Sequence, residues 1–307
     1  MKLLALLPPL VAIMTVVDAK LISSQDIDTS CGSSLIPTTS ASGVLNSAVE
    51  VEAMMKLGVQ ALTQSFSTLS VQEQIFQQLI MGTGTVLTAN RAAAANILQA
   101  TLSFAQGRAA SSRGRRLWIQ CGENSKSGIA SASDPDPEGK PLPTRYLYNT
   151  IQKRKLGGIL PVLAPLYPTA CLPNYRAYVD GSVMVLCSGF WNTYATAGSR
   201  RPIASTDTLS SVERNGKLIV GDSLNRIQDL ASFSILHELM HWGTWDGANS
   251  YTVGDANGYK WVDIADGFSS APAQTAQFYP FICFGTKLLR DGYSWSKDGK
   301  ITGVPSS

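Results

Sequence analysis

The two histidines of this chain stand four positions apart, in the segment His237-Glu238-Leu239-Met240-His241. Apolar residues recur at helical spacing from Asp229 to Trp242, and Gly243 follows, which predicts a helix across this segment. Side chains four residues apart share one face of a helix, so both imidazoles can bind one metal ion. Glu238 lies beside them and can accept a proton from water. The motif therefore predicts a zinc site with a catalytic base.

A third protein ligand is needed, and the sequence favours an aspartate. The chain has no third histidine, and no glutamate follows Glu238. The remaining donors after the motif are Asp246, Asp255, Asp263, Asp266, Asp291, Asp298 and Cys283. A cysteine in an oxidising compartment favours a disulfide over a metal ion. Asp263 is the preferred ligand, because its neighbours Val262 and Ile264 are apolar and a buried carboxylate without a partner is costly.

Two other aspartates stay open as alternatives to Asp263. Asp255 stands at the tip of an expected hairpin formed by residues 251–253 and 259–262, where plain turn residues are common. Asp246 lies five residues after His241, so its return to the metal would need a sharp reversal of the chain.

The overall composition indicates a folded protein without a nucleic-acid partner. The chain has 307 residues, of which 44% are hydrophobic and 15% charged, and its formal net charge is +3. Disorder requires low hydrophobicity and high charge. Recognition of nucleic acid requires a basic patch, and no run of like charges provides one here.

One long apolar stretch stands at the N-terminus. Residues 3–17 follow Lys2 and lead into Val17-Asp18-Ala19, with small residues at the two positions that a signal peptidase reads. The alternative is a membrane anchor, but the stretch is short and is interrupted by Pro8-Pro9. We therefore expect a signal peptide over residues 1–19, a secreted, extracellular protein, and no membrane association after its removal.

Secretion makes disulfides the expected state of the five cysteines. Cys171 and Cys187 flank a short apolar stretch and are predicted to pair with each other. Cys121 is expected to pair with Cys283. Because five is an odd number, one thiol is expected to be free, to pair with another chain or to leave with a cleaved segment.

The chain divides into a helical N-terminal region and a mixed C-terminal region. Helical periodicity, a capping box at Ser70-Val71-Gln72-Glu73 and a run of alanines predict helices near residues 44–59, 75–81 and 91–106. Further on, residues 117–119 and 182–186 are rich in β-branched and aromatic residues, as strands are. We therefore expect an α+β protein.

The boundary between the two regions is the basic segment 108–116, which ends in the pair Arg115-Arg116. This pair is either a processing site or part of a solvated turn within one domain. Residues 20–116 are accordingly either a propeptide or a part of the catalytic domain.

Four elements of the C-terminal region match the pattern of a known family. They are the His237–His241 motif, residues 263–267, residues 275–279, and residues 177–178 with 187–191. Together they make residues 117–296 similar to the aspzincins, the deuterolysin-like secreted zinc endopeptidases of fungi, which include a peptidyl-Lys-specific branch. In that family an aspartate in a Gly-Thr-x-Asp-x-x-Tyr-Gly segment binds zinc, and the similar position here is Asp263.

The resemblance implies a zincin-like metalloprotease fold, with a small mixed sheet and an active-site helix, over residues 117–307. It also implies one Zn²⁺ per chain, bound by His237, His241 and Asp263, and a protein or peptide substrate. Glu238 would act as general base on a zinc-activated water.

The chain departs from the family pattern at the tyrosine that stabilises the oxyanion. Asp266 stands at that position, and Trp261-Val262 replaces Thr-x before the aspartate. Tyr279 is the nearest substitute and is predicted to take the catalytic role of oxyanion donor.

A rival interpretation is a non-catalytic secreted zinc-binding or surface-interaction protein that retains the metal site. Glu238 argues against it, because capture of a metal ion alone needs no base between the two histidines. We therefore expect a zinc metalloendopeptidase.

Overall fold

The computed structural model describes the chain in several stretches. They are residues 21–22, 26–32, 40–106, 117–122, 129–133, 145–149, 154–155, 162–164, 167–168, 171, 176–191, 201–245, 253–255, 258–266 and 274–305. The predicted signal peptide, residues 1–19, and the basic segment 108–116 lie outside them. Within these stretches no helix is both long enough and apolar enough to cross a membrane.

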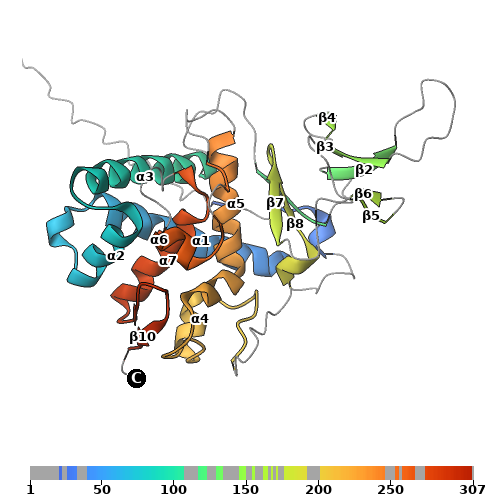
Figure 1. Ribbon diagram of the computed structural model, residues 1–307. Coiled ribbons are helices and arrows are strands. Elements are labelled where there is room, and N and C mark those ends of the chain that lie inside the picture. Colours follow the sequence, from blue (N-terminus) through green and yellow to red (C-terminus); the bar gives the residue numbers. More distant parts are fainter. Residues whose placement is uncertain are drawn as a thin grey trace, which may run out of the picture.

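The described residues form an α+β fold, as expected (Figure 1). The helices are α1 (Ser40–Thr63), α2 (Val71–Met81), α3 (Gly84–Ala105), α4 (Leu209–Arg214), α5 (Ala231–Trp245), α6 (Trp261–Asp266) and α7 (Phe278–Arg290). The strands are β1 (Trp118–Cys121), β2 (Ile129–Ser133), β3 (Arg145–Asn149), β4 (Arg154–Lys155), β5 (Val162–Ala164), β6 (Tyr167–Pro168), β7 (Ala177–Asp180), β8 (Val183–Leu186), β9 (Ser294–Trp295) and β10 (Ile301–Gly303). The three helices predicted in the N-terminal region are confirmed as α1, α2 and α3.

A small mixed sheet lies beside α5 (Figure 1). Its strand order is β1-β8-β7, in which β1 runs parallel to β8, with Trp118 opposite Val183, and β7 runs antiparallel to β8. All residues of β8 are buried, as in other central strands. The N-terminal segment extends this sheet, because Ile27 bridges Ile119 in parallel and the amide of Asp28 donates to the Ile119 carbonyl at 2.7 Å.

Helix α5 lies in the centre of the hydrophobic core. It packs against α1, α3 and α7 and against β7. The ring centroid of Phe104 in α3 lies 4.5 Å from that of Trp242. Gly243 allows this close approach, since a Cβ atom there would lie 2.6 Å from Thr101. The predicted helix end at Gly243 is therefore wrong: the glycine serves packing, and α5 continues to Trp245.

A buried carboxylate joins the N-terminal helices to α5. Glu50 of α1 accepts hydrogen bonds from the amide of Leu209 at 2.6 Å and from the hydroxyl of Ser232 in α5. Burial raises the pKa of Glu50, and the two donors and the charge of Lys287 oppose that rise. Helices α1 and α3 share one hydrophobic core with α5 and α7. Removal of residues 20–116 would therefore strip α5 of two of its neighbours.

Helix α2 begins at the predicted capping box. The amide of Glu73 donates to Ser70 Oγ at 3.2 Å, and the amide of Ser70 donates to the Glu73 carboxylate at 3.1 Å. The same carboxylate accepts from Arg290 of α7 at 2.8 Å. One side chain thus both starts α2 and ties it to α7.

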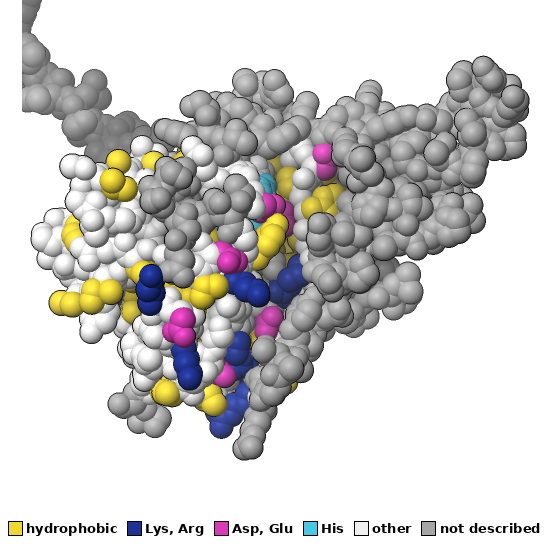
Figure 2. Space-filling view, viewed as in Figure 1, with side chains coloured by type: hydrophobic (Ala, Val, Ile, Leu, Met, Phe, Trp, Pro, Cys, Tyr) yellow, Lys and Arg dark blue, Asp and Glu magenta, His cyan; other side chains and the backbone are white. Residues whose placement is uncertain are grey.

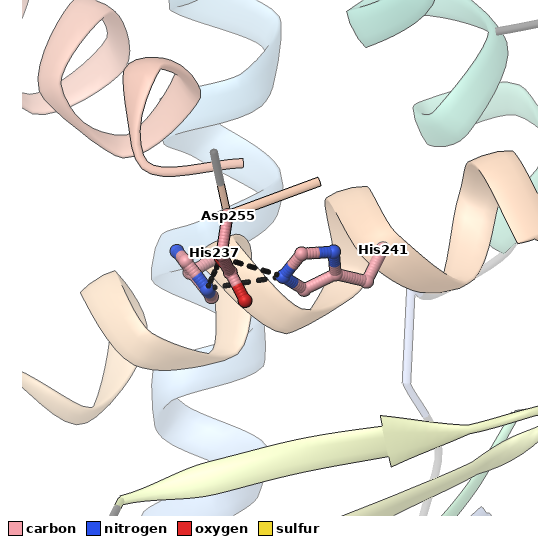
Figure 3. Close-up of side chains that lie close together, drawn as sticks. All are labelled: His237, His241 and Asp255. Atoms are coloured by element: carbon pink, nitrogen blue, oxygen red, sulfur yellow. Dashed lines mark hydrogen bonds and ion pairs between the residues drawn. The ribbon is translucent and has the colours of Figure 1, made fainter. Parts of the chain in front are cut away.

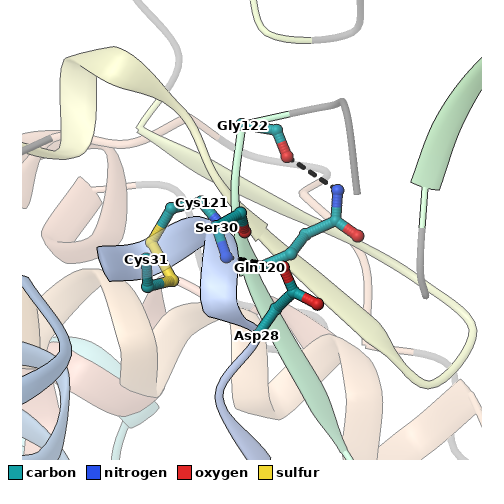
Figure 4. Close-up of a disulfide and its surroundings, with 6 residues drawn as sticks. All are labelled: Asp28, Ser30, Cys31, Gln120, Cys121 and Gly122. Atoms are coloured by element: carbon teal, nitrogen blue, oxygen red, sulfur yellow. Dashed lines mark hydrogen bonds between the residues drawn. A yellow bond between two sulfur atoms is a disulfide. The ribbon is translucent and has the colours of Figure 1, made fainter. Parts of the chain in front are cut away.

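Two disulfides are present, Cys31–Cys121 and Cys171–Cys187. The predicted Cys171–Cys187 pair is confirmed, whereas the predicted Cys121–Cys283 pair is wrong. The N-terminal segment that runs beside β1 brings Cys31 to the end of that strand (Figure 4). Cys283 is a buried free thiol in α7, where burial raises its pKa, and its sulfur packs against Gly58 of α1.

Loss of the Cys31–Cys121 disulfide should lower stability more than loss of Cys171–Cys187. The first joins residues 90 positions apart and the second residues 16 positions apart. Closure of loops of these lengths stabilises by about 4–5 and about 3 kcal/mol, respectively. We expect the double variant Cys31→Ser, Cys121→Ser to lose more free energy of unfolding than the double variant Cys171→Ser, Cys187→Ser. Urea unfolding of both variants measures the difference. A greater loss at the shorter loop would contradict this expectation.

A cluster of charged groups joins α4 to the end of α7. Lys287 Nζ lies 3.8 Å from the Glu213 carboxylate and forms a close ion pair with Asp291. Burial raises the pKa of Glu213 to about 8; a hydrogen bond with Asp291 and the charges of Asp291 and Glu50 add to the rise, and Lys287 opposes it. Glu213 therefore keeps its proton in the folded protein at pH values where an exposed glutamate has lost it.

This raised pKa should make the folded protein less stable as pH rises. An unfolded chain loses the Glu213 proton near pH 4.5 and the folded protein near pH 8. The contribution of Glu213 to the free energy of unfolding is thus full below pH 4.5, falls between pH 4.5 and about pH 8, and no longer changes above about pH 8. In Glu213→Gln, which does not titrate, the free energy of unfolding should fall less between about pH 5 and about pH 9 than in the wild type. Urea unfolding at both pH values measures the difference, and equal losses in the two proteins would refute it.

Candidate metal centre

Helix α5 carries the two imidazoles and the glutamate of the sequence motif. His237 and Glu238 are buried, and His241 is half-buried. The helix holds them firmly, because Leu239 and Met240 between them are fully buried in the core. The Nε2 atoms of His237 and His241 face each other at 3.2 Å.

The carboxylate that reaches these imidazoles belongs to Asp255 (Figure 3). Its Oδ1 atom lies 3.2 Å from His237 Nε2 and 3.1 Å from His241 Nε2. The three atoms form a triangle with nearly equal sides. Ligand atoms of a tetrahedral zinc ion, each about 2.0–2.1 Å from the metal, lie about 3.3 Å from one another. The spacing of the three atoms therefore fits a zinc ion.

The hydrogen bonding of His241 shows which charge the triangle can accommodate. His241 Nδ1 lies 3.0 Å from the carbonyl oxygen of Val253. A carbonyl oxygen only accepts, so Nδ1 carries the proton, and in a neutral ring the lone pair of Nε2 faces the Asp255 carboxylate. These groups repel each other unless a proton or a metal ion lies between them. The contact with Val253 also fixes the orientation of the ring, as a backbone carbonyl does for histidine ligands in known metal sites.

The two carboxyl groups of the centre differ in acidity. Burial raises the pKa of Glu238 and the charge of Asp255 adds to the rise, while His237 and His241 oppose it. Burial would also raise the pKa of Asp255, but hydrogen bonds from the two imidazoles hold it well below its usual range. Asp255 is thus a stable anion, and Glu238 is a stronger base than an exposed glutamate.

Asp255 is placed by a backbone bridge to the segment before α7. Gly254 forms a parallel bridge with Thr275. The amide of Gly254 donates to the carbonyl of Gln274 at 2.8 Å, and the amide of Ala276 donates to the carbonyl of Gly254 at 2.9 Å. The predicted hairpin around Asp255 is wrong on its second strand, because Trp261 begins α6. Asp255 is therefore held near the imidazoles by backbone pairing with a distant segment, and it does not stand at the tip of a hairpin turn.

Asp263, the ligand preferred from the sequence, is not part of this group. It is the third residue of α6, where its carboxylate accepts a hydrogen bond from the amide of Lys260 at 3.0 Å and caps the helix. Gly258 packs on it, since a Cβ atom there would lie 2.5 Å from Asp263 Oδ2. The apolar neighbours that favoured Asp263 belong to this short helix. Asp255 therefore replaces Asp263 in the candidate centre, and Asp246 lies outside the described residues.

The tyrosine beside the centre is Tyr259. Its ring centroid lies 5.7 Å from that of His237, and 52% of its surface is exposed. Tyr279, the predicted oxyanion donor, is fully buried in α7 with its ring 5.2 Å from that of Phe278. The sequence pattern predicts a hairpin strand at Tyr259 and does not indicate that this residue lies beside His237. The available signal was its position four residues after Asp255.

The centre reaches the surface of the described part of the molecule. The side chain of Asp255 is 43% exposed and that of His241 20%. Figure 2 shows histidine and acidic side chains together in a recess of this face. Other described donors considered from the sequence stay outside the group: Asp291, Asp298 and Cys283.

No family model, curated protein or solved structure matches this chain. The similarity of residues 117–296 to the aspzincins therefore stays a prediction. Function is inferred from the geometry of the centre.

Asp255→Asn should weaken metal binding far more than Asp263→Asn. Both changes keep the size of the side chain and remove its charge, but only Asp255 faces the imidazoles. Partners in the outer shell of a metal site typically contribute 10–100-fold in affinity, so loss of a ligand should lower Zn²⁺ affinity at least about a hundredfold. We expect less than about a threefold change in Asp263→Asn, by competition titration against a chromophoric chelator. Loss of zinc from Asp263→Asn alone would restore the choice made from the sequence.

Proposed function

We propose that this protein is a zinc endopeptidase, with His237, His241 and Asp255 as metal ligands and Glu238 as general base. The observation that carries the proposal is the triangle of two imidazole nitrogens and one carboxylate oxygen, with sides of 3.1 to 3.2 Å, beside a buried glutamate. The resemblance of the sequence to the aspzincins supports the same reaction class.

The donor set suits a catalytic zinc ion better than a structural one. Structural sites bind zinc through four protein ligands, whereas catalytic sites use three and leave one position for water or substrate. Three donors converge here, and the cysteines are either in disulfides or buried in α7. Zinc is a Lewis acid that polarises a carbonyl group and makes water a stronger acid.

Glu238 is proposed to carry the proton during hydrolysis. Its carboxylate accepts a proton from water as the water oxygen bonds to the carbonyl carbon of the peptide. The proton then passes to the amide nitrogen as the C–N bond breaks. Burial raises the pKa of Glu238, which brings it closer to the neutral range where one group serves as both acceptor and donor.

Tyr259 is proposed to stabilise the oxyanion. The carbonyl oxygen gains negative charge as water adds, and a positioned hydroxyl donor lowers the energy of that state. The Tyr259 ring lies beside His237 and is half exposed, so its hydroxyl can meet a bound peptide. We move this role from Tyr279, because a fully buried side chain does not meet an incoming substrate.

Secretion is part of the proposal. A signal peptide over residues 1–19 would direct the chain to an oxidising compartment. The two disulfides, Cys31–Cys121 and Cys171–Cys187, are the bonds that such a compartment favours. The proposed substrates are therefore extracellular proteins or peptides.

Glu238→Gln should abolish cleavage without releasing the metal. The amide keeps the shape of the side chain but cannot accept a proton, and loss of a general base lowers the rate by about 10²–10⁴-fold. Cleavage of casein and of a quenched fluorescent peptide library by zinc-loaded protein, with and without a chelator, measures the activity. Elemental analysis measures zinc.

Three outcomes of this experiment are informative. Chelator-sensitive cleavage that Glu238→Gln lacks supports the proposal. Cleavage that survives in Glu238→Gln points to a different base. Tight zinc binding by a wild-type protein that cleaves no peptide supports the non-catalytic zinc-binding alternative.

A further inference from the structure

Two glutamine side chains converge on the backbone carbonyl of Tyr259. Gln228 Nε2 donates to it at 2.7 Å and Gln277 Nε2 at 2.8 Å. Gln277 is almost completely buried, with 3% of its surface exposed. Gln228 also donates to Asn225 Oδ1 at 3.1 Å, which ties the carbonyl to the segment that precedes α5.

The next two backbone groups are held in the same way. The amide of Lys260 donates to the Asp263 carboxylate at 3.0 Å, and the amide of Trp261 donates to Asn225 Oδ1 at 2.6 Å. The Trp261 side chain is fully buried, and its indole N–H donates to the carbonyl of Lys297 at 2.8 Å. The backbone from Tyr259 to Trp261, which leads into α6, is thus held by side chains of four residues: Gln228, Gln277, Asp263 and Asn225.

The fixed backbone carries an exposed ring. Tyr259 is 52% exposed and lies beside His237, so its ring adds little to the core. Gln277 is a buried polar side chain, and burial of an amide costs free energy unless it is hydrogen-bonded. That its donor is used on the backbone of a surface tyrosine is explained if the position of the ring matters for the centre.

The segment at the start of α7 also places Asp255, the proposed metal ligand. Gln277 is the N-cap residue of α7, and Thr275, two residues earlier, forms the bridge that places Asp255. Residues 274–277 therefore contact the chain before and after Asp255. Their main chain binds Gly254, and the side chain of Gln277 binds the carbonyl of Tyr259.

We infer that Gln277, assisted by Gln228, is a positioning residue that sets where the Tyr259 hydroxyl meets a substrate. The inference rests on the proposed function for the role of Tyr259. The placement of the Tyr259 ring by Gln277 does not depend on that function, and a spectroscopic measurement without substrate tests it separately.

The kinetic test is a double-mutant cycle between Gln277→Met and Tyr259→Phe. Methionine keeps the length of the glutamine and removes its donor. Gln277→Met should lower kcat about tenfold and change KM less than about twofold, because one hydrogen bond to the tyrosine backbone is lost. Tyr259→Phe should lower kcat about a hundredfold. The double variant should be no slower than Tyr259→Phe alone, since a misplaced ring without its hydroxyl loses nothing more.

Gln77→Met is the matched control. Gln77 is also a buried glutamine whose amide donates to a backbone carbonyl, that of Ala61 at 3.2 Å, on the contact between α2 and α1. It should lower stability and leave kcat unchanged. Gln228→Met removes the other bond to Tyr259 from a more exposed side chain, and it serves as the second arm if Gln277→Met does not fold.

A measurement without substrate separates the two proposals. In protein labelled with 3-fluorotyrosine, Tyr259→Phe identifies the Tyr259 ¹⁹F signal. Gln277→Met or Gln228→Met should shift or broaden that signal, and Gln77→Met should not. An unchanged signal, or additive losses of kcat in the cycle, overturns the positioning role. If no variant and no wild-type protein cleaves peptides while the signal shifts as expected, the proposed function fails and the placement of Tyr259 by Gln277 stands.

Discussion

The burial of α5 is the constraint on which the rest of the structure depends. Helices α1, α3 and α7 and strand β7 surround it, and its residues Leu236, Leu239 and Met240 are fully buried. Aromatic contacts such as Phe233 with Phe281, at 5.2 Å between ring centroids, fill the space between α5 and α7. A helix enclosed in this way has little freedom to rotate or slide, since core packing is dense. The two imidazoles that project from its open face are therefore held at a fixed separation.

The centre combines this rigid helix with a segment held by hydrogen bonds. The helix supplies two nitrogens and Glu238, and residues 253–255 supply the carboxylate through their pairing with the segment before α7. Without a proton or a metal ion between them, the lone pair of His241 Nε2 and the Asp255 carboxylate repel each other at 3.1 Å. A bound metal ion would remove that repulsion and join α5 to the segment before α7, so that metal binding and local folding would support each other.

The sequence predicted the features that depend on residues close together in the chain, and it did not predict the features that depend on pairing between distant segments. The helix over His237–His241, the capping box at Ser70 and the Cys171–Cys187 disulfide each depend on residues close in the chain. Cys31–Cys121 depends on a bridge between Ile27 and Ile119, and Asp255 depends on a bridge between Gly254 and Thr275. Single bridges of this kind leave no hydrophobic period in the sequence. Asp263 was preferred for its apolar neighbours, which a short helix explains equally well.

During synthesis the ribosome releases the histidines of α5 before residues 274–277. Until those later residues emerge, Gly254 has no partner strand and Tyr259 lacks one of its two glutamine donors. A nascent chain that ends before residue 274 therefore contains Glu238 and both imidazoles but lacks the bridge that holds Asp255 against them. The candidate centre is therefore assembled only after the start of α7 has been translated, and not when its histidines emerge.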